Sequence, residues 1–291
     1  MEVDPCARCA GVSENGGRDR LNVVAGDSGY STIQSRSRRP PALRMKLALF
    51  ADIHSNLEAL TACLEHAKPQ GAERYAFLGD LVGYGADPVA VLEVIERFAD
   101  AGAAVVLGNH DAGVIGRSPG PLNRRALEAI AWTRTQLGPS QHAFLSRLPM
   151  TIREGETIFV HASAAAPERW TYVDSALQAE RSMLASGCAY TFCGHVHEQV
   201  LYYQGASGRP MPFRPVPGIP IPMGAHRSWL AVVGSTGQPR DRNNAACYAL
   251  ADLERARITF HRVPYDHVTA ARKILAAGLP ARFARRLARG E

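Results

Sequence analysis

Short apolar runs alternate with amphipathic segments through the first part of this chain. The runs have the length of buried strands, and the segments between them carry apolar residues at helical spacing. In chain order, strands and helices alternating, they are Leu47–Ala51, Asn56–Lys68, Tyr75–Leu78, Pro88–Ala101 and Ala103–Leu107. Asp87 directly before Pro88 is typical of a helix start. This β-α-β-α order predicts a parallel sheet covered by helices.

The later pattern predicts further helices, a hairpin and then a run of strands. We expect helices at Asn123–Leu137, Ser140–Leu148 and Asp174–Ser186. Asp174 would cap the third of these helices, and Gly187 would end it. A hairpin with its turn at Glu154-Gly155 is expected before Thr157–Val160, and a strand at Ala189–Cys193. Four strand-like runs follow with no long helix between them: Glu198–Tyr203, Trp229–Val233, Ala246–Ala251 and Arg257–Val263. They predict a second, largely antiparallel sheet that packs face to face on the first.

The segment Gly205–His226 interrupts these strands with many prolines and glycines. Because proline removes a ladder hydrogen bond, we predict a stiff loop here and no packed strand. Two roles stay open for this loop. Either the loop contacts a substrate, or its apolar residues Ile219, Ile221 and Met223 pack on a second subunit of a homo-oligomer.

The two ends of the chain differ from its middle. Residues 1–44 lack hydrophobic periodicity, so we expect a disordered extension there, and Met45 directly before the first strand suggests that translation starts at this residue. Residues 45–291 are expected to form a single domain, with a basic helical tail over about 268–291. The tail arginines Arg282, Arg285, Arg286 and Arg289 have helical spacing, which is typical of a solvated face.

Composition restricts the class of protein and its partners. The 291 residues are 46% hydrophobic, which is enough for a sizeable core. The chain has no apolar run long enough for a membrane span and no signal core, and its six cysteines lack the pairing of a secreted scaffold, so we expect a cytoplasmic protein with reduced thiols.

The net charge is +6, but residues 1–44 carry +2 and residues 270–291 carry +5, which leaves −1 for the middle. A nucleic-acid partner is therefore disfavoured.

Polar side chains that can bind metals follow five of the predicted strands. They occur in the segments Asp52-Ile53-His54, Gly79-Asp80, Gly108-Asn109-His110-Asp111, His161 and Gly194-His195-Val196-His197. Such strand ends converge on one edge of an α/β fold, and we expect Gly108 to allow a sharp turn there. Carboxylate and amide oxygens mixed with imidazole, without thiolates, suit two adjacent ions of manganese, iron, zinc, nickel or cobalt rather than a structural zinc. Five other histidines are assigned no role and are expected to be solvated: His66, His142, His226, His261 and His267.

The order of these motifs resembles the calcineurin-like metallophosphoesterase superfamily over about Lys46–His197. The segments Ala51–Leu60 and Gly234–Asp241 are similar to its small prokaryotic phosphodiesterase and phosphatase branch, which extends the likeness to about residue 265. The resemblance implies an αββα sandwich of mixed sheets with flanking helices. It also implies a hydrolase for a small phosphodiester or phosphomonoester.

The resemblance further implies a site residue by residue. One metal ion would bind Asp52, His54 and His197, and a second would bind Asn109, His161 and His195. Asp80 would bridge the two divalent or trivalent transition-metal ions, of which we expect manganese first. A hydroxide between the metals would attack phosphorus, and His110 would protonate the leaving oxygen.

The chain departs from the protein serine/threonine phosphatases of this superfamily. Those enzymes continue the Gly-Asp motif with a second aspartate and an arginine, whereas Leu81-Val82-Gly83-Tyr84 follows Asp80 here. Arg240 is either a replacement phosphate clamp or part of a turn cap with Asp241. The alternatives to a phosphoesterase are a nuclease, disfavoured by the near-neutral middle, and a silent metal-binding scaffold, disfavoured by the presence of His110.

Overall fold

Two six-stranded sheets form the centre of the protein. The structure, a computed structural model, describes residues 45–205 and 208–291, so the expectations for residues 1–44 lie outside the described residues. The strands are β1 (Leu47–Phe50), β2 (Arg74–Phe77), β3 (Ala104–Val105), β4 (Thr151–Glu154), β5 (Thr157–Val160), β6 (Tyr190–Cys193), β7 (Gln199–Gln204), β8 (Met211–Phe213), β9 (Ile221–Pro222), β10 (Ser228–Val233), β11 (Ala246–Asp252) and β12 (Arg257–Val263). Sheet A has the order β3-β2-β1-β11-β12-β9, and sheet B has the order β4-β5-β6-β10-β7-β8.

Both sheets mix parallel and antiparallel pairs. In sheet A, β1 pairs parallel with β2 and antiparallel with β11. In sheet B, β10 pairs parallel with β6 and antiparallel with β7. The predicted mixed sandwich is confirmed, but the separate antiparallel sheet of four late strands is wrong: β7 and β10 join sheet B, whereas β11 and β12 join sheet A.

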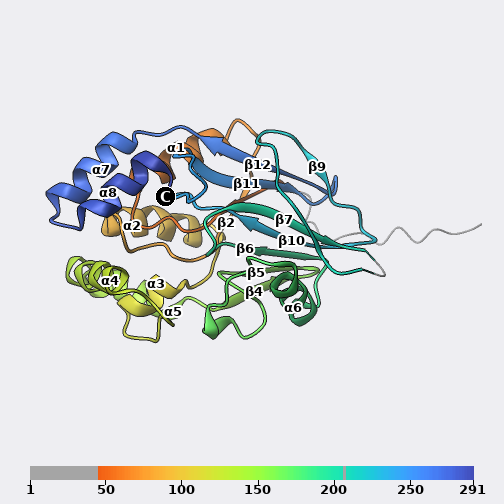
Figure 1. Cartoon of the computed structure of the whole chain (residues 1–291), viewed down its shortest axis with the longest axis horizontal. Coiled ribbons are helices and arrows are strands. Elements are labelled where there is room, and N and C mark those ends of the chain that lie inside the picture. The colour runs from red at the N-terminus through yellow and green to blue at the C-terminus, as the bar shows by residue number, and fades with distance from the viewer. Residues whose placement is uncertain (1–44, 206–207) are drawn as a thin grey trace, which may run out of the picture. The chain divides into compact units, whose positions relative to one another are not determined.

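Helices cover the outer faces of both sheets, as Figure 1 shows. They are α1 (Leu57–Ala67), α2 (Pro88–Asp100), α3 (Asn109–Val114), α4 (Arg124–Gln136), α5 (Pro139–Arg147), α6 (Ala176–Ser186), α7 (His267–Ala276) and α8 (Ala281–Arg289), with a short 3-10 helix at Pro167–Arg169. Apolar residues of α1 and α2 pack on the outer face of sheet A, and those of α6 pack on sheet B. The predicted basic tail is the helix pair α7 and α8, which has its own small core with part of α4.

The strand residues alternate between two cores, as the period of two requires. In β1, Leu47 and Leu49 face the space between the sheets, whereas Phe50 faces α1 and α2. In β10, Trp229 faces the space between the sheets and Leu230 faces α6. β1 and β10 are therefore buried on both faces.

Two helix caps have different partners from those expected. Ser175, and not Asp174, caps α6 by accepting a hydrogen bond from the Gln178 backbone N–H. Asp87 precedes α2 but makes no cap hydrogen bond, because its carboxylate accepts from Lys273 of α7 at 2.9 Å. The sequence predicted the bounds of α2, α4 and α6 to within two residues. It did not predict the partners of the polar side chains at the helix starts, because one of these partners comes from a distant helix.

The proline-rich segment forms two short edge strands, which corrects the prediction of a loop without strands. β8 extends sheet B and β9 extends sheet A, and each is the outermost strand of its sheet. Pro212 and Pro222 are tolerated there because an edge strand has one side without a ladder partner. Among the described residues, the contacts of the candidate metal ligands come from other segments, so the substrate-loop interpretation gains no support.

Two further observations concern membrane-spanning helices and the cysteines. Within residues 45–205 and 208–291, no helix combines the length and apolar character that crossing a membrane requires. Four cysteines in the described part of the chain are free and buried: Cys63, Cys188, Cys193 and Cys247.

Candidate metal centre

The carboxyl ends of five strands from both sheets meet at one edge of the sandwich, and their polar side chains converge there. Asp52 and His54 follow β1, Asp80 follows β2, Asn109 begins α3 after β3, His161 follows β5, and His195 and His197 follow β6. All seven residues are buried. The structure therefore brings together the complete set of ligands that the resemblance implies.

The backbone at these strand ends is strained. Asp52, His54, Asp80, His195 and His197 all have positive φ angles between 48° and 68°, which residues with side chains seldom adopt. Hydrogen bonds between neighbouring strand ends hold these conformations, including the Asp52 N–H to the Gly79 carbonyl at 3.0 Å. Such strain persists only where the surroundings enforce it, and it is common at functional sites.

Gly108 is required for close approach, not for a turn. Its φ of −100° and ψ of 172° are extended angles that any residue can adopt, so the expected sharp turn is wrong. A Cβ atom at this position would lie 1.9 Å from the Asp80 backbone nitrogen. The absence of a side chain therefore lets the strand end carrying Asn109 lie against the strand end carrying Asp80.

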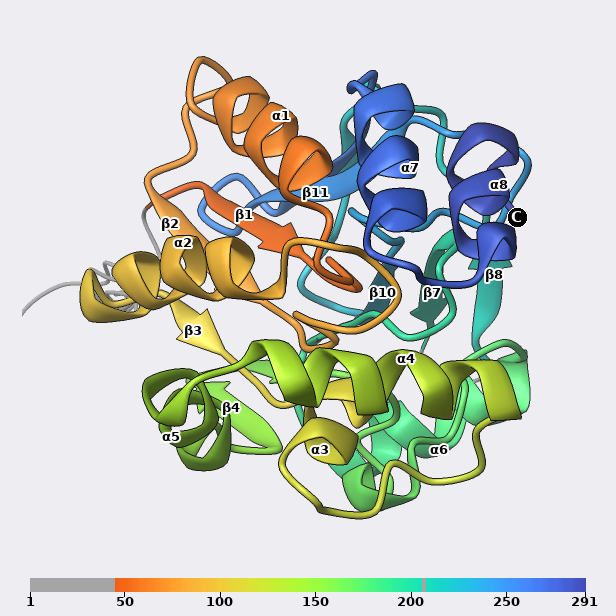
Figure 2. The same cartoon turned by 90° about the vertical axis from the view of Figure 1, so that its left-hand side faces the viewer.

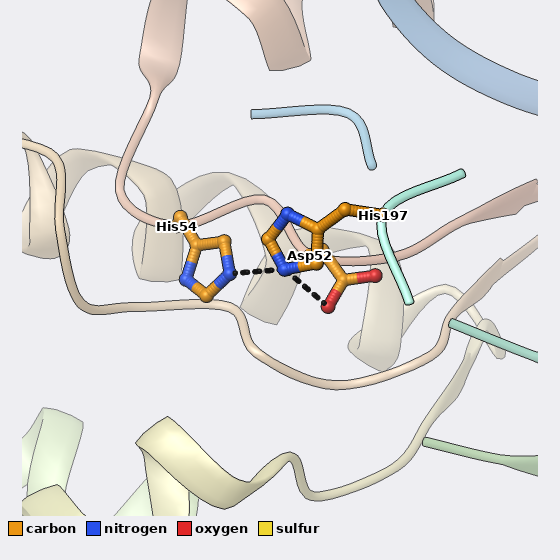
Figure 3. Close-up of side chains that lie close together, drawn as sticks. All are labelled: Asp52, His54 and His197. Atoms are coloured by element: carbon orange, nitrogen blue, oxygen red, sulfur yellow. Dashed lines mark hydrogen bonds and ion pairs between the residues drawn. The ribbon is translucent and has the colours of Figure 1, made fainter. Parts of the chain in front are cut away.

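Asp52, His54 and His197 form the first group of candidate ligands, which Figure 3 shows. The two imidazole Nε2 atoms are 3.1 Å apart, and Asp52 Oδ1 lies 3.3 Å from His197 Nε2. Asp52 Oδ2 accepts from the His195 backbone N–H at 2.8 Å, which orients the other carboxylate oxygen toward the histidines.

Asn109, His161 and His195 form a second group beside the first. His161 Nε2 lies 3.2 Å from Asn109 Oδ1 and 3.0 Å from His195 Nδ1. Trp170 packs edge-on against His161, and Tyr172 stacks on His195 with ring centroids 4.0 Å apart. The aromatic rings fix the orientation of the two imidazoles.

Asp80 lies between the two groups. Its Oδ1 accepts from the His110 backbone N–H at 2.8 Å, while its Oδ2 lies 3.7 Å from His54 Nε2 and 3.5 Å from His161 Nε2. One carboxylate oxygen therefore faces ligands from both groups.

The hydrogen bonds of His54 and His197 leave one nitrogen of each ring available to bind a metal ion. The Nδ1 atoms of His54 and His197 donate to the carbonyls of Val82 at 3.2 Å and Gln238 at 2.6 Å. Burial lowers the pKa of both imidazoles, so each is neutral and presents a lone pair at Nε2. Two lone pairs at 3.1 Å repel each other, and a metal ion held by His54 and His197 would remove that repulsion.

The titration of other groups reflects the concentration of charge. Burial would raise the pKa of Asp52, but the neighbouring His197 outweighs it and lowers this pKa to about 2. For His161, burial lowers the pKa, but the Asp80 carboxylate raises it to about 9. For His195, burial and the charge of His161 lower the pKa to about 3. The pKa values of Asp52 and Asp80 are both below the usual value, so both carboxylates are ionised at neutral pH, as a cation site requires.

His110 lies beside the first group and is buried. Its ring centroid is 4.9 Å from that of His54, and one of its ring nitrogens forms a third candidate cluster with a ring nitrogen of His54 and a carboxylate oxygen of Asp80. Its Nδ1 is buried and has no hydrogen-bond partner among the described residues. Burial lowers the pKa of His110 to about 4 even though the Asp80 charge acts in the opposite direction.

Asp111 connects the loops and does not face the metal ligands. Its carboxylate accepts three backbone N–H bonds, from Gly108 at 3.0 Å, Val82 at 3.1 Å and Leu81 at 3.2 Å. Burial and the Asp80 charge raise its pKa to about 7, whereas these hydrogen bonds act in the opposite direction. It therefore ties the segment after Asp80 to the segment that carries Asn109 and His110.

Arg240 reaches the site from the turn after β10. Its guanidinium donates to Gln238 Oε1 at 3.2 Å, and its charge contributes to the low pKa values of His110 and His197. The alternative of a turn cap with Asp241 finds no support in the described contacts, because Asp241 pairs with Arg262. The backbone N–H of Arg240 donates to the carbonyl of His197 at 3.3 Å, so the residue lies beside the first group.

Several residues at the site were assigned no role from the sequence. They comprise Tyr84, Trp170, Tyr172, Gln238 and Arg286, and of these Gln238 lies in the segment Gly234–Asp241 that carries the resemblance. The sequence predicted a basic helical tail, and it did not predict that Phe283 and Leu287 of α8 are buried against α7 and α4.

This fold and this cluster define a class of protein: two-sheet α/β sandwiches with a histidine and carboxylate metal centre at the edge of the strands. The model of the family described as "Calcineurin-like phosphoesterase superfamily domain" matches residues 45–256. The chain belongs to this superfamily, as its motifs predicted.

Individual relatives agree with this assignment. An uncharacterized protein of Methanocaldococcus jannaschii is 33% identical over 255 residues, which cover 84% of this chain and 98% of that protein. The crystal structure of a metallophosphoesterase from Sphaerobacter thermophilus has 33% identity and a TM-score of 0.76, covering 85% of this chain and 99% of the other. A hypothetical protein from Pyrococcus horikoshii, at 21% identity and a TM-score of 0.68 with coverage of 85% and 99%, shares the fold.

Proposed function

We propose that this chain is a dinuclear metal-dependent phosphoesterase that hydrolyses a small phosphodiester or phosphomonoester. The position of Asp80 Oδ2 carries the proposal, since it lies 3.7 Å from His54 Nε2 and 3.5 Å from His161 Nε2, between two groups of ligands. Asp80 would contact both ions. The ligands of one ion would be Asp52, His54 and His197, and those of the other would be Asn109, His161 and His195.

The residues around the metal ligands have separable roles. When bound, two such cations stabilise phosphate charge as Lewis acids and lower the pKa of an attacking water. His110 is neutral in the ligand-free protein, because burial lowers its pKa to about 4. The negative charge of a bound phosphate raises this pKa and lets His110 carry the proton that the leaving oxygen takes up.

Arg240 and the aromatic residues orient the substrate. The guanidinium of Arg240 presents several N–H groups in one plane, which suits two oxygens of a phosphate. Tyr172 and Trp170 cover His195 and His161 and limit the access of bulk water from that side. Phosphoproteins are not the expected substrates, because the residues after Asp80 supply neither the second aspartate nor the arginine of protein phosphatases.

Hydrolysis of bis(p-nitrophenyl) phosphate and p-nitrophenyl phosphate tests the proposal. The purified protein should hydrolyse at least one of these esters with added Mn²⁺, lose activity after EDTA treatment and dialysis, and regain it when Mn²⁺ is restored. Manganese is the metal we propose, and iron, zinc, nickel and cobalt are tested in parallel. Protein that binds two metal ions by elemental analysis and yet hydrolyses neither ester with any of them would be a scaffold, and the proposal would be wrong.

A further inference from the structure

The C-terminal helix α8 places arginines beside the metal centre. Its apolar residues Phe283 and Leu287 are buried in the core formed with α7 and α4. Packing of this face fixes the rotation of the helix, and Arg282 and Arg286 line a cleft of about 520 Å³ together with Arg125 of α4. α4 and α8 lie on the side of the protein that faces the viewer in Figure 2. The expectation of a merely solvated basic face is therefore wrong for Arg286, which is partly buried.

The positive charge of this cleft is not balanced by carboxylates. Glu128, which also lines the cleft, is occupied by Arg124 at 3.0 Å. In the described part of the chain, no hydrogen bond or ion pair is seen between a carboxylate and Arg125, Arg282 or Arg286 within 4.0 Å. Like charges held together are unfavourable unless an anion joins them.

Arg240 and Arg286 share one neutral acceptor. Gln238 Oε1 accepts from Arg240 at 3.2 Å and lies 3.5 Å from Arg286 Nη1, and the Nε atoms of both arginines are buried without partners in the described residues. Burial lowers the pKa of Arg286, and the charges of Arg240 and Arg282 lower it further. Arg240 and Arg286 therefore both have N–H donors without a hydrogen-bond partner among the described residues.

Tyr84 connects the cleft to the metal centre. One side of its ring lies against His110 and His54, with centroids 4.4 Å and 4.7 Å away, and Phe283 of α8 packs on it at 5.0 Å. Tyr84 also lines the cleft. The ring of Tyr84 therefore lies between the arginine cleft and the metal centre.

We propose that Arg125, Arg282 and Arg286 form an anion subsite that binds a second phosphate group of the substrate, at a distance from the phosphate that is hydrolysed. This inference rests on the proposed function, because the first phosphate is placed at the metal centre. The substrate class is a small molecule with at least two phosphate groups, either on separate positions or in a polyphosphate chain. Arginine is suited to this role because its planar guanidinium binds phosphate through two parallel hydrogen bonds.

A small molecule fits the cleft better than a nucleic-acid strand. The volume of about 520 Å³ is in the range of small-molecule sites. Residues 45–269 carry a net charge of −1, because acidic residues match the basic ones there, whereas a strand needs a continuous basic track.

Two measurements on the full chain test the subsite. Isothermal titration calorimetry of metal-free protein with inorganic tripolyphosphate and orthophosphate measures anion binding without catalysis. Kinetics of the Mn²⁺-loaded protein compare thymidine 5′-(p-nitrophenyl phosphate) with the same ester carrying a 3′-phosphate, so that the two substrates differ only in the second phosphate. Wild-type protein should bind tripolyphosphate at least about tenfold more tightly than orthophosphate, and the 3′-phosphate should lower KM by a similar factor, as expected for charge-assisted hydrogen bonds.

The variant Arg125→Gln/Arg282→Gln should lose most of both preferences. Both side chains are exposed, so folding is retained, and circular dichroism checks this. The control Arg181→Gln/Arg272→Gln removes the same charge from exposed positions that do not line the cleft, and it should keep both preferences. Equal preferences in the wild type and the Arg125→Gln/Arg282→Gln variant would overturn the proposal.

Two other outcomes distinguish the anion subsite from a nucleic-acid surface and from the proposed function. A 12-nucleotide single strand that displaces tripolyphosphate and binds far more tightly than it would indicate a nucleic-acid surface and overturn the small-molecule subsite. Absence of hydrolysis of both esters would refute the proposed function. Calorimetry would still support or reject the anion subsite in that case, because it needs neither metal nor turnover.

Discussion

Asp80 accepts the backbone N–H of His110 with one carboxylate oxygen and directs the other toward His54 and His161. The residue proposed to contact both metal ions therefore also fixes the start of the helix that carries the proposed proton donor. Geometry at the metal site and geometry at the leaving group are coupled through this one carboxylate. Substitutions at Asp80 and His110 should consequently have different effects on metal content and rate.

Asp80→Asn should lose metal and turnover together. An asparagine can keep its oxygen on the His110 N–H, but its amide nitrogen then faces His54 and His161 and cannot bind a cation. We expect fewer than two ions per chain by elemental analysis and a fall in kcat of at least about 10²-fold. Asp174→Asn, at an exposed position, is the matched control. Unchanged metal content and rate in Asp80→Asn would exclude the bridging role.

His110→Ala should keep both metal ions and lose rate. A general acid contributes roughly 10²–10⁴-fold for poor leaving groups, and nitrophenolate, a good leaving group, should show a smaller loss. The measurement is kcat for an alkyl phosphate ester and for a nitrophenyl ester, together with metal analysis. Because His110 lies near His54 and Asp80, loss of metal from this variant would instead identify it as a ligand.

Metal binding should raise thermal stability. The facing lone pairs of His54 and His197, 3.1 Å apart, repel each other in the metal-free protein, and a cation removes this repulsion. At free metal about 100 times above Kd, mass action stabilises by about 2.7 kcal/mol, which for a chain of this size raises Tm by roughly 5 °C or more. Differential scanning calorimetry with Mn²⁺ and with EDTA measures this shift. His197→Ala should reduce the shift, whereas His226→Ala at an exposed position should leave it intact.

The sequence predicted the strands better than their partners. Apolar runs identified β1, β6, β10 and β11, because both faces of each strand are buried. The sheet to which each strand belongs depends on pairs between distant segments, such as Leu47 with Ala251 and Trp229 with Tyr190. No local pattern encodes these pairs, so β11 and β12 were placed in the wrong sheet.

The convergence of the candidate ligands could be predicted because each of them follows a strand, and strand ends meet at one edge. The residues around them could not, because they depend on loops and on the docking of α8. Tyr172 reaches His195 from a loop after a 3-10 helix, and Arg286 reaches Gln238 across 48 residues. His261 was expected to be solvated, but β12 buries its ring against Tyr248. Helical spacing or alternation shows that a face is buried, and it does not show what buries it.

His261 should make the folded protein less stable as pH falls below neutrality. Its ring stacks on Tyr248 at 4.6 Å, its Nε2 has no partner among the described residues, and burial lowers its pKa from 6.5 to about 4, with a smaller contribution from His66. In the unfolded chain the imidazole takes up a proton below about pH 6.5, whereas the folded chain takes it up only below about pH 4. The unfolded state therefore binds more protons between these values, and the free energy of unfolding decreases as pH falls through this window.

His261→Phe should flatten this dependence. Phenylalanine keeps the stacking on Tyr248 and cannot be protonated, and the unpartnered Nε2 has no hydrogen bond to lose. Urea denaturation of metal-free protein at pH 7 and pH 5 should show that the wild type loses about 1 to 2 kcal/mol more than this variant, since each unit of pKa difference contributes about 1.4 kcal/mol. His226→Phe, at an exposed position, should retain the wild-type dependence. If His261→Phe loses as much stability as the wild type over this range, protonation of His261 does not determine the acid sensitivity.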